Sequence, residues 1–171
     1  LRTQIEKDLA VNLATKAIAT ATNVRENSSA FEAKKVNDNN ANTNWETNDG
    51  VTEASITLAF DTPTKINRIL LQEYIPLGQR IKEFSVEAEV NGKWQYIDKQ
   101  TTLGYKRILR FDTIEALKVR VNIVAKAAIT LSNIALYHAP NLLTEPEIKR
   151  DAEGNVTMSV ADKHIEIHYT T

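Results

Sequence analysis

The sequence predicts an all-β fold, an antiparallel β-sandwich or jelly roll, because short strand patterns recur along most of the chain and helical patterns are almost absent. Turn signals separate these patterns, and the strongest is Asn91-Gly92, a dipeptide typical of two-residue hairpins. With 171 residues and no cysteine, the chain is long enough to bury a core without disulfide bonds. We expect the sandwich to span residues 12–141.

The individual strands are predicted from the alternation of apolar and polar residues, which places one side of each strand against a core. Residues 54–60 alternate in this way, and Pro63 is expected to end that strand before another begins at Ile66. The remaining expected strands are 66–73, 84–88, 94–97, 107–111, 119–125 and 129–137.

Two flanking segments are expected to lie outside the sandwich. Residues 1–11 have the apolar spacing of a short amphipathic helix, which is too short to be stable alone and therefore suggests a helical linker from an upstream domain. Residues 142–171 begin as a linker and then carry three strand patterns, at 148–150, 156–160 and 165–169. Because three strands rarely close a core, we expect this segment to be the truncated start of a second β domain.

Composition excludes several classes of partner. Lys and Arg number 21 against 22 Asp and Glu, so the sequence offers no electrostatic basis for binding nucleic acid or an anionic membrane. No apolar run approaches the ~20 residues of a membrane span. His164 and His168 have the i, i+4 spacing of a helical metal pair, but they lie in a strand pattern, where they would be about 13 Å apart.

An asparagine-rich stretch, residues 36–45, combines one carboxylate, several amides and a hydroxyl, and ends at Trp45. Asn and Asp side chains compete with the backbone for hydrogen bonds, so this stretch is expected to be a tight polar loop anchored by a buried aromatic ring. Its oxygen atoms suit calcium, and the alternative is a loop held by its own hydrogen bonds. An EF-hand is excluded because Thr43 occupies the position that requires glycine and no amphipathic helix follows.

The opening of the chain resembles discoidin domains, also called coagulation-factor type C domains, a group that includes carbohydrate-binding module family 32. The resemblance is carried by Asn12-Leu13-Ala14, Ala19-Thr20-Ala21 and the series from Asp38 to Trp45. Four further segments resemble the C-terminal domain of α-L-fucosidases of glycoside hydrolase family 29. They are Leu71-Gln72-Glu73, Gly78-Gln79-Arg80-Ile81, Phe84-Ser85-Val86 and the series from Thr101 to Arg107.

The resemblance implies a non-catalytic accessory domain that binds carbohydrate, joined through residues 1–11 to a catalytic domain that hydrolyses α-L-fucosides. A catalytic barrel would need about 250 residues of its own, so this chain is not expected to be the enzyme itself. The implied partners are fucosylated or galactosylated glycans and the chain's own catalytic domain, in an extracellular or periplasmic setting. Residues 142–171 resemble the start of a chitobiase-type C-terminal domain. The alternative is a purely structural domain that buttresses the barrel and binds no ligand.

The resemblance also implies a structural calcium ion in the asparagine-rich loop, with Asp38, Asn40 and Thr43 as ligands. Related sugar-binding modules add a glutamate near the last strand, and the corresponding residue here is Asn133. Replacing that carboxylate with an amide removes one charge and a bidentate contact, so a lower calcium affinity is expected.

Four residues are candidates for binding sugar. Tyr74 and Tyr105 lie beside loops, where aromatic rings could stack on the apolar face of a sugar. Arg25 could donate hydrogen bonds to sugar hydroxyls or simply be solvated. Arg80 could bind sugar or pair with Glu73 to hold the loop at Gly78.

Each of the two tryptophans could either bind a sugar or belong to the core. Either Trp45 or Trp94 could stack on a sugar, since both rings offer a flat apolar surface. The discoidin pattern implies that Trp45 belongs to the core.

Overall fold

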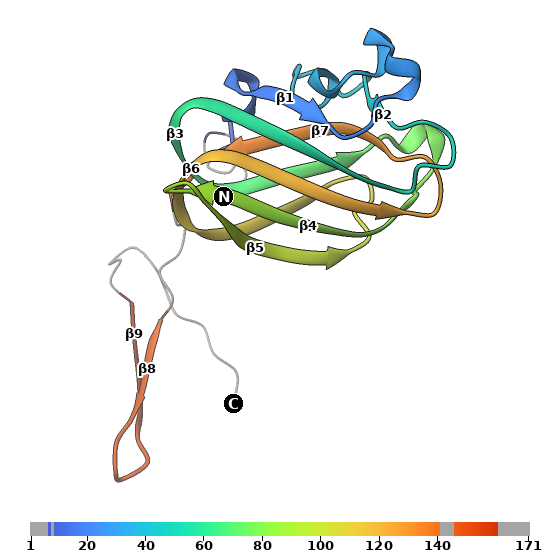
Figure 1. Cartoon of the computed structure of the whole chain (residues 1–171). Coiled ribbons are helices and arrows are strands. Elements are labelled where there is room, and N and C mark those ends of the chain that lie inside the picture. The colour runs from blue at the N-terminus through green and yellow to red at the C-terminus, as the bar shows by residue number, and fades with distance from the viewer. Residues whose placement is uncertain (1–6, 8, 141–145, 161–171) are drawn as a thin grey trace. The chain divides into compact units, whose positions relative to one another are not determined.

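The computed structural model describes residues 7, 9–140 and 146–160 (Figure 1). The chain divides into two compact units, Leu1–Ala139 and Pro140–Thr171. The first unit is built from seven strands that pair antiparallel throughout its described part. The predicted all-β fold is therefore confirmed.

Two long bent strands, β3 (Glu53–Glu73) and β6 (Arg107–Ala125), organise this unit because each pairs with different neighbours in its two halves. The first half of β3 and the second half of β6 form one layer, and their other halves form the second layer. The first layer is completed by β1 (Ile18–Ala21), β4 (Ile81–Val90) and β5 (Lys93–Thr101). The second layer is completed by β7 (Thr130–Tyr137) and the short β2 (Trp45–Glu46).

The expected end of a strand at Pro63 was wrong, because β3 continues through it. The pairing of β3 with β6 jumps from Ala59↔Lys118 to Thr64↔Ala116, so Pro63 lies in an irregular stretch outside the regular ladder. Proline has no N–H to donate and is tolerated at such bulges, where the strand also bends. The same bend joins the strands expected at 107–111 and 119–125 into β6.

The predicted hairpin is confirmed between β4 and β5. Asn91 and Gly92 both have positive φ, 52° and 74°, as a type I′ turn requires. The inward side chains of the strands form one large core, which includes Trp45, Phe84, Ile56 and Leu131.

Short 3-10 helices make up much of the segment before β2. They are η1 (Leu13–Lys16), η2 (Arg25–Asn27), η3 (Ser29–Phe31) and η4 (Ala33–Val36), and a fifth, η5 (Ile75–Leu77), follows β3. The buried Asn37 amide nitrogen donates to the carbonyl oxygens of Ala14 and Ala17 at 2.7 and 2.9 Å. These bonds tie the start of the asparagine-rich loop to η1.

The second unit contains a two-stranded antiparallel sheet of β8 (Glu147–Arg150) and β9 (Val156–Ser159). Ile148 and Val156 are exposed on it. The third expected strand, with His164 and His168, lies outside the described residues, as does most of the expected N-terminal helix, of which Lys7 is helical. Among the described residues, no helix has the length and apolar character needed to cross a membrane.

Candidate functional site

Several loops meet at one end of the sandwich, which we call the loop end. It consists of residues 23–28, 46–52, 74–80, 102–106 and 126–129. Backbone hydrogen bonds join these loops in series. They run from Thr47 N–H to Ile129 O at 3.1 Å, from Lys126 N–H to Arg80 O at 2.8 Å and from Glu73 N–H to Gly104 O at 3.3 Å. Residues far apart in the sequence therefore share a single surface.

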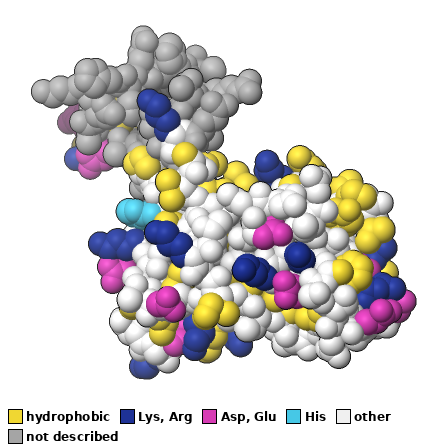
Figure 2. Space-filling model, turned by 90° about the horizontal axis from the view of Figure 1, so that it is seen from above, with side chains coloured by type: hydrophobic (Ala, Val, Ile, Leu, Met, Phe, Trp, Pro, Cys, Tyr) yellow, Lys and Arg dark blue, Asp and Glu magenta, His cyan; other side chains and the backbone are white. Residues whose placement is uncertain are grey.

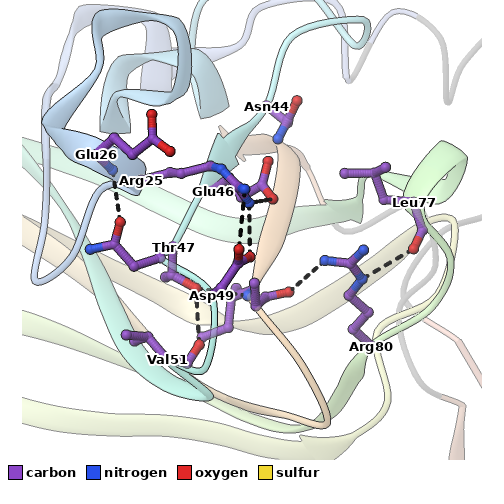
Figure 3. A network of polar contacts seen from close by, with 12 residues as sticks. Arg25, Glu26, Asn44, Glu46, Thr47, Asp49, Val51, Leu77 and Arg80 are labelled. Carbon is purple, nitrogen blue, oxygen red and sulfur yellow. Dashed lines mark hydrogen bonds and ion pairs between the residues drawn. The ribbon is translucent and has the colours of Figure 1, made fainter.

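Arg25 is held at the loop end by two carboxylates (Figure 3). Its guanidinium donates to Glu46 Oε1 at 2.8 Å and to both carboxylate oxygens of Asp49, at 3.0 and 3.3 Å. These charges, first Asp49 and then Glu46, raise the pKa of Arg25 above its usual value. The Glu46 side chain is buried and needs a charged partner, so the guanidinium is largely committed to holding the loops.

Glu73 and Arg80 both hold the loop at Gly78, but they do so through separate contacts. The Glu73 carboxylate, only 1% exposed, accepts hydrogen bonds from the backbone N–H groups of Arg80 and Ile81. The Arg80 guanidinium instead donates to the carbonyl oxygens of Leu77 and Ala128, each at 3.1 Å (Figure 3). Both residues thus stabilise loop conformation through backbone atoms.

The two candidate tyrosines lie on adjoining parts of the loop end. Tyr105 is 63% exposed, and the Lys106 ammonium lies 5.7 Å from its ring centroid. Tyr74 is half-buried, and its N–H is 3.5 Å from the carbonyl oxygen of Thr130. The hydrogen bond from the Glu73 N–H to the Gly104 carbonyl oxygen joins the end of β3, next to Tyr74, to the loop that carries Tyr105.

The asparagine-rich loop folds around Asp38. One carboxylate oxygen accepts from the Asn40 N–H at 2.9 Å, and the other accepts from the Thr43 hydroxyl at 2.7 Å. The amide oxygen of Asn40 accepts from the Asn42 N–H at 3.1 Å. These are the internal hydrogen bonds expected of such a loop.

Three oxygen atoms surround the Thr43 hydroxyl. Its oxygen lies 2.8 Å from the Asn40 carbonyl oxygen and 3.4 Å from the Lys35 carbonyl oxygen, in addition to the Asp38 carboxylate. One hydroxyl proton serves only one acceptor, and the Asn40 carbonyl oxygen also accepts from the Thr43 N–H at 3.1 Å. Carboxylate, hydroxyl and carbonyl oxygens of this kind are also the ligands that a hard cation prefers. Among the described residues, no group of three or more His, Cys, Asp or Glu side chains could hold a metal ion, so most of the ligands would be neutral oxygens.

Asn133 lies on β7, beside the strand that leads out of this loop. Trp45, at the end of the loop, pairs with Leu131, two residues before Asn133 on β7. Asn133 itself pairs with Gln72 on β3. Asn12 provides a further link, since its side chain bonds both Asn39 and the Leu136 N–H.

Trp45 belongs to the core, as the discoidin pattern implies. It is fully buried, and its indole N–H donates to the Asn23 carbonyl oxygen at 2.8 Å. Stacking of a sugar on this ring is excluded, whereas Trp94 is exposed on β5.

Sequence reasoning missed the acidic partners of Arg25. Glu46 and Asp49 lie one and four residues after Trp45 in the sequence, and this position just after a core tryptophan was the only signal of their structural importance.

On the face seen in Figure 2, Lys and Arg side chains lie beside Asp and Glu side chains. This mixture agrees with the net charge of -1.

Known protein families and proteins of similar sequence include β-sandwich domains that match this chain. The profile of the F5/8 type C domain family matches residues 18–138. An alpha-L-fucosidase 1 from Arabidopsis thaliana is 32% identical over 120 residues, which cover 68% of this chain and 24% of that protein. The chain therefore spans about a quarter of the length of this relative.

Solved structures show the same fold. A GH29 fucosidase of Ruminococcus gnavus, in complex with fucose, matches with a TM-score of 0.76 and 25% identity over 81% of this chain and 29% of that one. A chitosan-binding module from a Paenibacillus sp. IK-5 chitosanase/glucanase has a TM-score of 0.66 and 21% identity, and the match covers 75% of this chain and 99% of the module. The fold and the profile match together show that this chain belongs to the F5/8 type C, or discoidin, domain family.

Proposed function

We propose that this chain is a non-catalytic accessory domain that binds glycans through its loop end, as part of a longer α-L-fucosidase. The observation that carries the proposal is the exposed Tyr105 on a loop joined to the one carrying Tyr74 and Arg80. Aromatic rings on loops held by buried hydrogen bonds offer a preorganised surface for an apolar sugar face. The similarity to fucosidases supports the identity of the longer protein.

Fucosylated or galactosylated glycans are the proposed ligands, and an extracellular or periplasmic setting is the proposed location. Binding such glycans would raise their effective concentration near the tethered catalytic domain. The domain would thereby assist hydrolysis without supplying a catalytic group.

A purely structural role is the second candidate, and the contacts of the two arginines favour it. Arg25 is committed to two carboxylates, and Arg80 is bonded to two backbone carbonyl groups. Both side chains therefore stabilise the loop end whether or not a ligand binds.

The two candidates differ in the effect expected of Tyr105→Ala. If the loop end binds glycan, this change should weaken binding about tenfold, because an exposed aromatic anchor is lost. Calorimetric titration of the full chain with fucosyllactose and N-acetyllactosamine would measure the loss, with Ile18→Ala as a control for an exposed apolar residue away from the loop end. Equal binding by Tyr105→Ala and the unchanged protein would refute the loop-end site, and no binding by either would favour the structural role.

We also propose that the asparagine-rich loop binds a structural calcium ion. Asp38 and Thr43 would contribute side-chain oxygens, and Asn40 and Lys35 carbonyl oxygens, because these atoms already converge. Bound calcium would neutralise Asp38 and draw the oxygens together. Asn133 would contribute at most an amide oxygen in place of the family's carboxylate.

Millimolar calcium should therefore raise the melting temperature, and a chelator should reverse the effect. A ligand of the native state stabilises it by about 2.7 kcal/mol at a hundredfold excess over its Kd. Asp38→Asn should abolish the shift, Asn133→Glu should enlarge it, and the exposed Asp61→Asn should leave it unchanged. Absence of any shift in both the unchanged protein and Asn133→Glu would rule out this proposal.

A further inference from the structure

The outer surface of the first layer carries a group of side chains that the loop end does not use. Trp94 and Tyr96 on β5 are 39% and 63% exposed. Beside them lie Glu87 on β4 and Arg120 and Asn122 on β6, which also face outward because their neighbours Val86 and Val121 point into the core. We call these five residues the sheet-face platform.

The two-residue hairpin at Asn91-Gly92 fixes the face on which the two aromatic residues lie, because it pairs Glu89 with Trp94 and Glu87 with Tyr96. The pairing of β4 with β5 changes from Val86↔Asp98 to Glu87↔Tyr96, so Ile97 is an extra residue on β5. Beyond this β-bulge, Lys99 pairs with the outward-facing Ser85. Without the extra residue, Lys99 would pair with the inward-facing Phe84, because a shift of one residue moves a side chain to the other face of a sheet. Bulges often re-aim side chains beside functional sites. Here the bulge keeps Lys99 on the same outer face as Trp94 and Tyr96.

The platform is held in one arrangement by charged contacts. The Arg120 guanidinium lies 4.1 Å from the Trp94 ring centroid and donates to Glu87 Oε2 at 2.9 and 2.8 Å. The Asn122 amide nitrogen donates to the same oxygen at 2.9 Å. The hydrogen bond from Asn122, followed by the bond and charge of Arg120, lowers the pKa of Glu87 below its usual value although partial burial opposes this. The contact with Arg120 thus holds the Trp94 side chain in one conformation, so less conformational entropy is lost when a ligand binds.

A hollow of about 380 Å³ adjoins the platform and shares Asn122 with it. Its lining includes the hydroxyl residues Thr22, Ser55 and Ser85, and the ion pair between Lys99 and Glu83, 2.6 Å apart. The volume lies within the range of small-ligand sites. Glu83 and Lys99 neutralise each other, and Glu53, the remaining charged residue of the lining, can accept hydrogen bonds from hydroxyl groups. The lining therefore disfavours an anion and suits a neutral ligand rich in hydroxyl groups.

We propose that the platform and the hollow together form a second binding site, for a neutral oligosaccharide. One sugar ring would stack on Trp94, and its neighbours would hydrogen-bond to Asn122, Ser85 and the residues of the hollow. From the level of Glu87 to that of Glu83 is about 13 Å along the strand at ~3.3 Å per residue, so the site extends beyond a single ring. The paired charges Arg120–Glu87, Lys118–Glu89 and Lys99–Glu83 give this face no net attraction for an anion. This inference does not depend on the loop-end site.

Tryptophan fluorescence of the full chain offers a direct test. The chain contains two tryptophans, and Trp45 is fully buried, so a ligand that stacks on an exposed ring reports on Trp94. The probes are fucosyllactose, N-acetyllactosamine and chitopentaose, compared with the monosaccharides fucose and galactose. An oligosaccharide should change the emission and protect it from acrylamide quenching, and the monosaccharides should bind at least tenfold more weakly.

Matched variants separate this site from the loop end. In a Tyr105→Ala background, which removes the loop-end contribution, Trp94→Ala should weaken oligosaccharide binding at least tenfold in calorimetry, and Trp94→Phe should retain part of it. Tyr105→Ala alone should leave the fluorescence change intact. Circular dichroism would verify that each variant is folded, which is expected because Trp94 is exposed. Binding that Tyr105→Ala removes and Trp94→Ala does not would overturn this inference while leaving the loop-end proposal standing. The inference would also be overturned if no oligosaccharide bound, or if Trp94 mediated association with another protein and not with any oligosaccharide.

Discussion

Glu73→Ala is expected to lower the free energy of unfolding by about 2–4 kcal/mol, because it leaves two backbone donors without an acceptor. The N–H groups of Arg80 and Ile81 both bond to Glu73 Oε1, and Ile81 is buried. The same change would loosen the loop that carries Arg80. Urea denaturation followed by circular dichroism would measure the effect through the midpoint at unchanged slope.

Two further variants separate the lost hydrogen bonds from the lost charge. Glu73→Gln keeps an amide oxygen as acceptor and removes a buried negative charge whose second oxygen, Oε2, has no hydrogen-bond partner among the described residues. We therefore expect Glu73→Gln to stay within about 1 kcal/mol of the unchanged protein. Glu83→Ala, which removes an exposed carboxylate paired with Lys99, is the matched control and should cost about 1 kcal/mol or less. Equal losses in the Ala and Gln variants would mean that charge, rather than the two N–H bonds, is what Glu73 contributes.

The largest loss of stability is expected from Trp45→Ala, about 3–5 kcal/mol, the usual result of removing a large aromatic ring from a core. The ring is fully buried, and its indole N–H bonds the Asn23 carbonyl oxygen, which would lose its partner. Trp45 also lies at the end of the asparagine-rich loop and pairs with Leu131 on β7. Its removal should therefore weaken any calcium-dependent shift as well as the core.

Trp94→Ala provides the matched comparison, since the same substitution is made on an exposed ring. It should cost about 1 kcal/mol or less, the scale of a surface change that removes a cation–π contact with Arg120. Thermal and urea denaturation of both variants would test the difference. Comparable losses at the two positions would contradict the assignment of Trp45 to the core and Trp94 to the surface.

The sheet-face platform and the loop end make different demands on a ligand. The loop end offers Tyr105 beside Tyr74 and Arg80, a compact surface suited to the end of a glycan. The platform and its hollow extend along a strand and suit several consecutive sugar units. A domain with both sites would bind branched or repeating glycans more tightly than either site alone, because the second contact is made at a high effective concentration.

Local sequence was sufficient for much of the fold. Period-two alternation identified the inward positions of the strands, since residues two apart lie on the same face wherever the strand runs. Asn91-Gly92 predicted its hairpin because few other dipeptides adopt two consecutive positive φ angles at low cost. The prediction at Pro63 was wrong because a strand can contain proline wherever the adjacent strand does not require a hydrogen bond from that position. Whether it does depends on the pairing of the two strands and not on the local sequence.

The candidate sites were predicted less completely for the same reason. The Asp38 loop was evident in the sequence because its hydrogen bonds join residues a few positions apart. The carboxylate partners of Arg25 and the backbone contacts of Glu73 could not be read from spacing, since they depend on which loops meet. Arg25 lies 21 residues from Glu46, and the Arg80 guanidinium bonds a carbonyl group 48 residues away.

The sequence by itself determined the all-β class, the hairpin, the polar loop ending at a core tryptophan and the resemblance to discoidin domains, because each of these is encoded within a few consecutive residues. Only the tertiary structure decided that β3 and β6 bend through both layers, that an extra residue at Ile97 keeps Lys99 on the outer face with Trp94 and Tyr96, and that Arg120 supports the Trp94 ring. These features depend on register between strands. Register is set by the packing of the whole core, which no short stretch of sequence contains.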